Sequence, residues 1–591
     1  MIFEARETPY NNRTGIVAEG LKLLGLTEPK SGVFAKTGID VSPNMVTIPA
    51  HAINTPTVLY NGTSMQPNMQ QLWHPGGHMF FGGTNTQPST DSQATPESGR
   101  FSGHILVLYS QNQEATLARE CATELMKTLN KHGVNIYDEE GNYVDFGRAD
   151  RRNFWLASHI HVQMINIHPQ SCANTMRKTI NSQTPRPSLV MYKNPTKGVE
   201  YADQFAKFKK LLDTELGIHS ICISSQDVYK AKITKDKQNR PKSRLPQYLS
   251  NVALKANIKL GYVNHSLELA QNEKSILYDG QGRLDTLILG ADVNHPQGAS
   301  SDLAPSIAAV VGGVDDTFGR FLGSVRYQEA KTEIIAELGD MVKDRLNDWY
   351  DQNGRVPSNI LYYRDGVGES QYQQIRAREI PQIREAYRHF CEEKAEKIET
   401  MPEKVNITAV VVTKRHHTRF YSDTRGNENC PVGTCVESGV THPCYFDFFL
   451  QSHKAVAGTA KPSYYFVLEN DMNFTPKVLQ DFTYALCFTY VRVCLPVSYV
   501  PPVYYADRLC DRARSYIKGM KVTPPGKFNL ERPKKKKKDE SQLSWETRFA
   551  SWRTAQKEWR QKDHWTGTFD GKSGNRAGPW HPRLNNTMFW M

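Results

Sequence analysis

Long apolar runs are absent from this sequence: no stretch of about 18 apolar residues occurs, which is the length that a membrane-spanning helix requires. Residues 1–7 lack the basic region and the long apolar core of a signal peptide. Cysteine is sparse as well, because 10 cysteines in 591 residues are too few for a secreted disulfide scaffold, and most are expected to be reduced thiols. These absences predict a soluble protein without a membrane partner, located in the cytoplasm or, alternatively, in the nucleus.

A general excess of basic charge is also lacking, although the net charge is +12. Residues 517–591 contain 17 Lys and Arg against 7 Asp and Glu, which gives +10 and leaves the remainder nearly neutral. Nucleic-acid binding must therefore be argued from local clusters. The run Lys534–Lys538 is expected to be a solvated charge block, with a nuclear signal or a nucleic-acid-binding arm as alternatives.

Two apolar runs in the second half of the chain end in aspartates. Leu287–Ala291 is predicted to be a buried strand that ends at Asp292, and Asn359–Tyr363 is followed closely by Asp365. Such aspartates can face the crevice where open α/β sheets bind ligands, although they also cap turns. Two more strands and a helix are predicted between them, at Ser306–Gly313, Phe321–Tyr327 and Lys331–Trp349. Three strands, a helix and a fourth strand is the order of an RNase H-like α/β fold, which gathers acids around two divalent ions.

Four motifs follow one another in this half of the chain: Asp292-Val-Asn-His-Pro296, Tyr363-Arg-Asp-Gly-Val367, Lys414-Arg-His-His-Thr-Arg419 and Tyr504-Tyr-Ala-Asp507. Together they resemble the PIWI domain of eukaryotic Argonaute proteins, of fungal type. The resemblance implies a linker-2-like segment with a mobile connector at 1–100, a Rossmann-like MID domain at 101–265, and an RNase H-like PIWI domain with a basic, Trp-containing C-terminal insertion at 266–591. No counterpart of the N-terminal and PAZ domains is recognised, so we expect a natural short form, a misplaced start codon or a fragment.

The first half of the chain carries weaker patterns. A helical run at Gly15–Gly25 and a strand-like piece at Met45–Pro49 precede residues 83–100, which are rich in Gly, Thr, Ser, Pro and Gln and predict the connector. Beyond it, strand, helix and strand alternate as in a doubly wound α/β domain, at Ile105–Tyr109, Glu114–His132 and Ser188–Tyr192.

Lysines on two predicted helices form the candidate binding site of this domain. Lys255 and Lys259 are spaced i,i+4, so both ammonium groups project from one helix face, and Lys209 lies on the other helix. From the residues alone, an ordinary solvated face is the alternative. The resemblance implies instead a pocket for the 5′-phosphate of a small guide RNA, completed by Arg512, because converging cations suit a phosphate dianion.

Three features of this pocket depart from the family pattern. The family has a Tyr one helical turn before the first lysine, where an ungapped comparison places Phe205; Tyr201 lies a further turn back, and either ring could stack on the first base. Ile221 stands where many relatives have Gln, and an extra basic loop, Lys230–Arg244, separates the two halves of the pocket.

By the same resemblance, the catalytic carboxylates are Asp292, Glu333, Asp365 and Asp507, of which the three aspartates are the expected metal ligands. Asp507 lies on a predicted helix opened by Pro501-Pro502, and the Tyr-Tyr-Ala register selects it over Asp511. Glu333 is expected to be a glutamate finger that moves in when guide and target are paired; from the residues alone, it could be an exposed helix-start glutamate. Oxygen ligands favour two Mg²⁺ ions, or Mn²⁺, over zinc.

Three further clusters are interpreted separately. Lys414, Arg415, His416 and Arg419 follow the predicted strand Ile407–Val412 and are expected to contact the nucleic-acid backbone, with a solvated basic turn as the alternative. Four residues are of the types that bind zinc, but their spacing is irregular: Cys430, Cys435, His442 and Cys444. This spacing favours reduced cysteine thiols over a structural zinc site. A stripe of tryptophans at seven-residue spacing predicts a helix docked on the domain or on a partner: Trp545, Trp552 and Trp559. The terminus Met588–Met591 resembles the buried end of the family.

The sequence therefore favours a guide-RNA-directed endoribonuclease of RNA silencing, whose partners are a small guide RNA and a complementary target RNA. The alternative is a guide-binding scaffold that silences through recruited effector proteins without cutting, and a guide-independent nuclease is the third hypothesis. The four intact acids favour the first. The unrecognised PAZ and N-terminal domains favour the second, because the 3′ end of the guide would be unheld.

Overall fold

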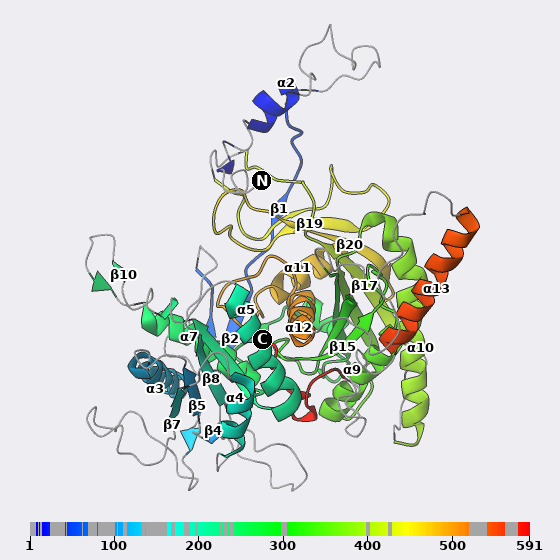
Figure 1. Ribbon diagram of the computed structural model, residues 1–591. Helices are drawn as coiled ribbons and strands as arrows, with labels where there is room; N and C mark the ends of the chain where they lie inside the picture. Colours follow the sequence, from blue (N-terminus) through cyan, green and yellow to red (C-terminus); the bar gives the residue numbers. More distant parts are fainter. Residues whose placement is uncertain are drawn as a thin grey trace.

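A computed structural model of the chain has two main sheets, a large mixed sheet and a smaller parallel one (Figure 1). The structure describes residues 8–9, 11, 15–23, 42, 44–61, 63–68, 80, 101–102, 105–109, 115–132, 136–137, 162–166, 172–182, 189–194, 199–224, 227–228, 234–235, 241–242, 244–296, 304–397, 402, 404–423, 428–518, 541–561 and 577–591. Among them no helix combines the length and the apolar character needed to cross a bilayer.

The large sheet has nine strands in the order β1-β18-β19-β20-β17-β16-β13-β14-β15. At its centre β13 (Thr286–Asn294), β16 (Asn359–Asp365) and β17 (Asn406–Thr413) are parallel, and β14 (Ser306–Gly313) and β15 (Phe321–Gln328) continue the sheet antiparallel. The predicted α/β class and RNase H-like order are confirmed. The other strands are β1 (His51–Ala52), β18 (Thr434–Val436), β19 (Asp447–Gln451) and β20 (Ser463–Asn470).

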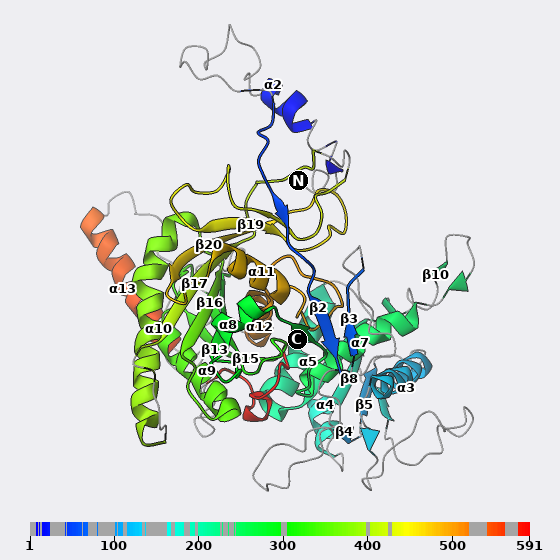
Figure 2. The same cartoon turned by 180° about the vertical axis from the view of Figure 1, so that it is seen from behind.

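Helices cover both faces of this sheet (Figures 1 and 2). On one face lie α9 (Leu338–Asn353) and α10 (Tyr372–Lys394), and on the other lies α12 (Pro501–Ile517) with α11 (Pro476–Leu486) beside it. Two glycines let α12 approach closely. A Cβ at Gly290 of β13 would lie 2.2 Å from the carbonyl carbon of Pro502, and one at Gly323 of β15 would lie 2.4 Å from a methyl of Leu509.

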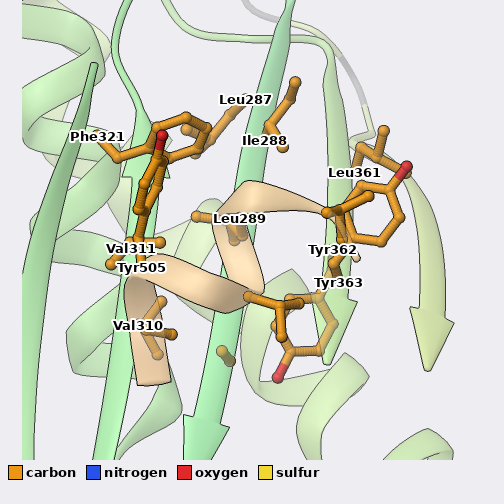
Figure 3. Close-up of a cluster of buried hydrophobic side chains, with 14 of the residues drawn as sticks. Leu287, Ile288, Leu289, Val310, Val311, Phe321, Leu361, Tyr362, Tyr363 and Tyr505 are labelled. Carbon is orange, nitrogen blue, oxygen red and sulfur yellow. The ribbon is translucent and has the colours of Figure 1, made fainter. Parts of the chain in front are cut away.

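The main core lies between α12 and the central strands (Figure 3). Tyr505 of α12 packs against Phe321 of β15, with ring centroids 5.2 Å apart, and both are fully buried. The strand residues around them are apolar at nearly every position, because both faces of β13 and β14 are covered. This burial explains why these strands appear in the sequence as continuous apolar runs.

The smaller sheet is parallel throughout, in the order β7-β5-β8-β9. Its strands are β7 (Val162–Asn166), β5 (Ile105–Tyr109), β8 (Leu189–Asn194) and β9 (His219–Ser224). The helical elements around it are α3 (Ala115–Lys131), α4 (Cys172–Asn181), α5 (Val199–Lys210), η6 (Leu211–Leu216) and α7 (Leu245–Lys259). The predicted alternation of strand and helix is confirmed. Residues 577–591 join the two sheets, since the amide of His581 donates to the Asp213 carbonyl at 2.9 Å and that of Val325 to the Ala577 carbonyl at 2.8 Å.

Shorter elements complete the described structure. They are η2 (Gly15–Gly20), α2 (Leu21–Leu23), β2 (Thr57–Tyr60), β3 (Thr63–Met65), β4 (Phe101–Ser102), β6 (Ile136–Tyr137), β10 (Thr234–Lys235), β11 (Pro241–Lys242), β12 (Ser266–Glu268), α8 (Gln271–Leu277), η7 (Glu369–Gln371), η8 (Ala395–Lys397), α13 (Gln542–Gln561) and η9 (Pro582–Leu584). The predicted helical run at Gly15–Gly25 falls on η2 and α2. The strand predicted at Met45–Pro49 is wrong: this segment pairs with no strand, and Pro49 has no N–H to donate.

Two predictions about the tail have different outcomes. The terminus Met588–Met591 is buried, as expected. The Trp-bearing segment is helical as α13, but Trp545 stacks on Phe549 of the same helix at 5.1 Å, and no side chain of residues 541–551 is buried. Docking of this helix stays a prediction, because the side chains of Trp552 and Trp559 lie outside the described residues. The connector 83–100 and the run Lys534–Lys538 also lie outside them.

Candidate functional site

The four carboxylates that the sequence predicted line one cavity of about 420 Å³ at the edge of the central strands, together with that of Asp511. Asp292 comes from β13, Asp365 from β16 and Asp507 from α12, and Glu333 comes from the turn between β15 and α9. The structure thus brings together all four acids that the sequence predicted, and we refer to this cavity as the acid cavity.

The parallel register of β13 and β16 places the first two acids side by side. Ala291 pairs with Arg364, so the next residues along the two strands are Asp292 and Asp365. One expectation needs correction: β13 does not end at Asp292 but continues to Asn294, because Asp292 also pairs with Ala309 of β14. Asp292 is therefore held by β14 on one side and directly follows the last residue of β13 that pairs with β16 on the other.

The helix predicted at Lys331–Trp349 begins only at Leu338, so the alternative interpretation of Glu333 as an exposed helix-start glutamate is wrong. The carboxylate of Glu333 is instead clamped between two side chains. Nη1 of Arg364 donates to it at 2.9 Å, and Nε2 of His295 lies 2.7 Å from its other oxygen. Glu333 is 9% exposed, so its side chain already forms part of the cavity wall.

Negative charge is crowded in the acid cavity. Burial, followed by the nearby carboxylates of Asp365 and Asp507, raises the pKa of Asp292 to about 8. Burial also raises the pKa of Asp365, although the ammonium group of Lys414 opposes this shift through an ion pair. The carboxylate of Asp507 has its own cation, because Nη2 of Arg508 lies 3.1 Å from it.

These acids fit a divalent metal by their chemistry. Hard carboxylate oxygens suit Mg²⁺ or Mn²⁺, and a cation would relieve the crowding that perturbs Asp292. In the part of the chain that the structure describes, however, no three His, Cys, Asp or Glu side chains are arranged to hold a metal ion. Lys414 and Arg508 instead neutralise Asp365 and Asp507. Metal binding therefore requires these cations to leave the carboxylates.

A second cavity, of about 460 Å³, lies between α5, β9, α7 and α12, and we refer to it as the cationic cavity. Five of the predicted guide-binding residues line it: Phe205, Lys209, Lys255, Lys259 and Arg512. Ile221 also lines it, at the position where the sequence departs from the family. Tyr201 lies on α5, but its side chain is outside the described residues.

The deepest cations of this cavity are held by neighbouring oxygens. Nζ of Lys209 donates to the carbonyl and hydroxyl of Ser220 at 3.0 and 2.6 Å. Nη1 of Arg512 donates to Asp213 at 2.7 Å, and Lys259 donates to the carbonyl of Phe589 in the C-terminal segment. Burial lowers the pKa of Lys209 to about 8, and burial together with Arg492 lowers that of Lys255 to about 8. Burial thus disfavours the charged forms of Lys209 and Lys255, and an anionic ligand would favour them.

Sequence reasoning missed two arginines that line the cationic cavity, Arg492 and Arg508. Arg492 follows α11 in a segment without regular structure, and no spacing in the sequence connects it with the lysines. A signal for Arg508 was available: Asp507 and Asp511 are four residues apart, as are Arg508 and Arg512, so acids and bases occupy adjacent faces of α12.

The basic motif after β17 divides into two parts. Lys414 and Arg415 line the acid cavity, as expected for side chains that meet a nucleic-acid backbone. The other two residues bond to nearby backbone: a ring nitrogen of His416 lies 2.8 Å from the Pro462 carbonyl, and Arg419 donates to the Thr418 carbonyl at 2.8 Å.

The candidate zinc residues are not assembled into a site among the described residues. Cys435 is buried within β18, whereas Cys444 is exposed, and both are free thiols. His442 contacts the ring of Tyr445 at 4.4 Å and accepts from the amide of Cys444 at 3.1 Å.

Comparison with known proteins identifies the family. The sequence profile of the Piwi domain matches residues 197–518, more than half of the chain, and the chain belongs to this family. Its fold is that of the MID-PIWI portion of eukaryotic Argonaute proteins, as the sequence motifs predicted. The Piwi match begins before residue 266, the boundary that we expected from the sequence.

Three solved structures have a similar fold. The C-terminal lobe of a budding yeast Argonaute is 22% identical, with a TM-score of 0.66 over 92% of this chain and 95% of that one. The Kluyveromyces polysporus Argonaute with a guide RNA is 21% identical, with a TM-score of 0.68 over 100% of this chain and 61% of that chain. Drosophila Piwi is 19% identical, with a TM-score of 0.64 and coverages of 86% and 60%. The chain thus spans less than two thirds of the last two proteins.

Proposed function

We propose that this chain is a guide-RNA-directed endoribonuclease that binds the 5′-phosphate of a small RNA in the cationic cavity and cuts complementary RNA at the acid cavity. The observation that carries this proposal is the pairing of the two cavities on one helix. Asp507 of α12 lines the acid cavity, and Arg512 of the same helix lines the cationic cavity. A site for an RNA end and a site with four carboxylates are thus held at a fixed separation.

The cationic cavity supports recognition of a terminal phosphate. Its lysines and arginines converge from two helices of the smaller sheet and from α12, so a dianion would accept several charge-assisted hydrogen bonds at once. Phe205 lies beside them, with Nζ of Lys209 5.7 Å from its ring centroid, and can stack on the first base. The similar Kluyveromyces polysporus protein was solved with a guide RNA, which supports this assignment.

The acid cavity supports hydrolysis of a phosphodiester. Asp292, Asp365 and Asp507 would hold two Mg²⁺ ions, or Mn²⁺. When bound, such ions polarise the phosphate, lower the pKa of an attacking water and stabilise the leaving oxygen. The carboxylate of Glu333 is oriented by Arg364 and His295. The products would be a 3′-hydroxyl and a 5′-phosphate.

The basic residues beside the acids support binding of the RNA backbone. Nζ of Lys414 lies over the ring of Tyr499, 3.7 Å from its centroid, and it also forms an ion pair with Asp365. A backbone phosphate offers Lys414 another anion. If Lys414 moved from Asp365 to this phosphate, Asp365 would be available to a metal. Arg415, which is exposed at the same cavity, can contact the next phosphate.

A second function has its own supporting observation. Lys414 neutralises Asp365 and Arg508 neutralises Asp507, an arrangement that suits a protein which binds a guide but does not cut. Under this alternative, the chain silences through recruited effector proteins. We retain the division into a linker-2-like segment (1–100), a MID domain (101–265) and a PIWI domain (266–591) as part of the proposal.

The test is to incubate the purified chain with a 5′-phosphorylated guide, a labelled complementary RNA and Mg²⁺. The proposal expects one cut opposite the guide, which disappears with EDTA and with a non-complementary guide. A bound guide without any cut would favour the scaffold. Cutting without a guide would favour an undirected nuclease.

A further inference from the structure

The helix α12 carries a residue that reaches both cavities at once. Arg508 lines the cationic cavity together with Arg512. Its guanidinium nevertheless points to two acids, because Nη2 lies 3.1 Å from Asp507 and Nη1 lies 3.3 Å from Asp511. Asp507 lines the acid cavity, and Asp511 lines both cavities. One side chain therefore connects the proposed phosphate site with the proposed metal site.

We propose that Arg508 is a coupling residue: a 5′-phosphate in the cationic cavity draws its guanidinium away from Asp507 and so makes this carboxylate available to a divalent cation. This inference rests on the proposed function and adds to it an order of events. In the absence of a guide end, Arg508 takes the place of a metal on Asp507. When a guide end is bound, Arg508 pairs with the 5′-phosphate, and Asp507 can bind the divalent cation.

The ion pair with Arg508 and a metal on Asp507 oppose each other by charge. A guanidinium 3.1 Å from the carboxylate lies within direct reach of any ion that this carboxylate would bind, and the two cations repel. The same cavity already has Lys414 on Asp365. Each protein cation that remains thus lowers the affinity of the site for Mg²⁺ or Mn²⁺.

Arg508 is also able to exchange partners. Its side chain is 37% exposed, and besides the two acids it contacts the ring of Tyr504, whose centroid lies 5.3 Å from Cζ. Nε of Arg508 is buried, and no described residue hydrogen-bonds to it. A phosphate with three oxygens could accept from Nε and Nη together, which is the bidentate geometry that arginine favours.

Linkage fixes the sign of the expected effect. If the phosphate releases Arg508 from Asp507, it raises the affinity for the metal, and the metal must raise the affinity for the phosphate by the same factor. A purely structural role of Arg508 predicts no such mutual effect. The coupling is therefore measurable without any cleavage.

The experiment measures Mn²⁺ binding to the full chain by electron paramagnetic resonance, with a 5′-phosphorylated guide and with the same guide ending in a 5′-hydroxyl. The wild-type protein should bind Mn²⁺ about tenfold more tightly with the phosphorylated guide than with the hydroxyl guide, which is within the usual range of coupling. In Arg508→Leu, Mn²⁺ should bind tightly with either guide, so the ratio should fall to about one. Arg508→Gln, which keeps polar character at this partly exposed position, should behave in the same way.

The matched control is Arg514→Leu. Arg514 lies on the same helix and lines only the acid cavity, where it donates to the carbonyl of His295 at 3.3 Å. Its loss changes the charge near the metal without touching the phosphate, so the ratio between the two guides should persist.

Two different results would overturn the inference. The coupling is wrong if Mn²⁺ binds the wild type equally well with both guides, or if Arg508→Leu and Arg508→Gln keep the wild-type ratio of Mn²⁺ affinities. In that case the assignments of the two cavities are unaffected. If guide affinity itself ignores the 5′-phosphate, the assignment of the cationic cavity fails, and the coupling fails with it.

Discussion

Replacing Arg364 by Met should destabilise the protein severely, because Arg364 lies at the centre of a buried ionic network. Its side chain is 1% exposed, and its partner Glu379 on α10 is fully buried. Nε of Arg364 donates to Glu379 at 3.2 Å, and Nη2 donates to the carbonyl of Glu333 at 2.6 Å. Although burial opposes its charge, the carboxylates of Glu379 and Glu333 raise the pKa of Arg364, so it stays cationic.

The magnitude follows from what the substitution leaves behind. Without Arg364, the carboxylate of Glu379 keeps only two donors among its described contacts, the Tyr362 hydroxyl at 2.8 Å and the amide of Ile335 at 3.0 Å. Removing one partner of a buried ion pair costs about 3–5 kcal/mol. The double variant Arg364→Met with Glu379→Gln leaves no unpaired charge on Glu379, so it should be less destabilised than the sum of the single variants by about 1–3 kcal/mol.

The assay is urea unfolding followed by circular dichroism, with Arg388→Met as the matched control. Arg388 lies on α10, the helix that carries Glu379. Its side chain is 58% exposed and pairs with the exposed Glu385 and Glu392. The control should therefore lose at most about 1 kcal/mol. If Arg364→Met is equally mild, or if the double variant is strictly additive, the network does not stabilise the fold as argued.

Three further predictions concern the two cavities and the core. Asp292→Ala should abolish cleavage and leave guide affinity nearly unchanged, because Asp292 lines only the acid cavity; retained cleavage in a single-turnover assay would contradict its role. Lys255→Ala should weaken a 5′-phosphorylated guide by about tenfold or more and scarcely affect a 5′-hydroxyl guide, whereas equal losses in filter binding would contradict the pocket. Lys255 is the cleaner probe, because Lys259 also holds the C-terminal segment. Burial lowers the pKa of His265 from 6.5 to about 4, so the unfolded state binds the extra proton between these values. The free energy of unfolding should fall by up to about 3 kcal/mol as the pH drops from 6.5 to 4. His265→Gln should lose this part of the slope in urea titrations, and an unchanged slope would refute the cause.

Much of the fold and two of the acids, Asp292 and Asp365, could be predicted because burial leaves a direct mark on the sequence. β14 was predicted with its observed bounds, since a strand covered on both faces is apolar throughout. The aspartates then follow from where those runs stop. The same logic places the end of β13 at Asp292, two residues too early, because a polar residue within a strand resembles the end of the strand in the sequence.

Glu333 shows what periodicity alone cannot reveal. The apolar pair Ile334-Ile335 continues the helical pattern of α9 backwards, yet Lys331 has a φ of 63°, which no right-handed helix allows. The turn is held by a side chain: Nε2 of Gln328 donates to the carbonyl of Thr332 at 2.7 Å and to that of Ile334 at 3.0 Å. Such side-chain capping of backbone groups depends on tertiary position and has no periodic signature.

The ion pairs of the two cavities were invisible in the sequence for a related reason. Asp365 ends β16 and Lys414 follows β17, so the two residues are far apart in the sequence. Arg508 and Asp507 are adjacent in a helix, a spacing at which side chains do not usually face each other. The parallel pairing of β16 with β17, which sets Asp365 opposite Val412, brings Lys414 to Asp365. Asp507 reaches the same cavity through the packing of α12 against the sheet.

That packing also decides how the two cavities can communicate. The helix α12 meets β13 at Gly290, where even a methyl group would lie 2.2 Å from the backbone of Pro502, and it meets β15 at Gly323 in the same manner. A helix packed this closely has little room to slide, because close-packed interiors resist compression. A signal from the cationic cavity to the acid cavity therefore has to pass through side chains that turn on a fixed helix. Arg508 is placed to do this, since it is partly exposed, lines one cavity and holds an acid of the other.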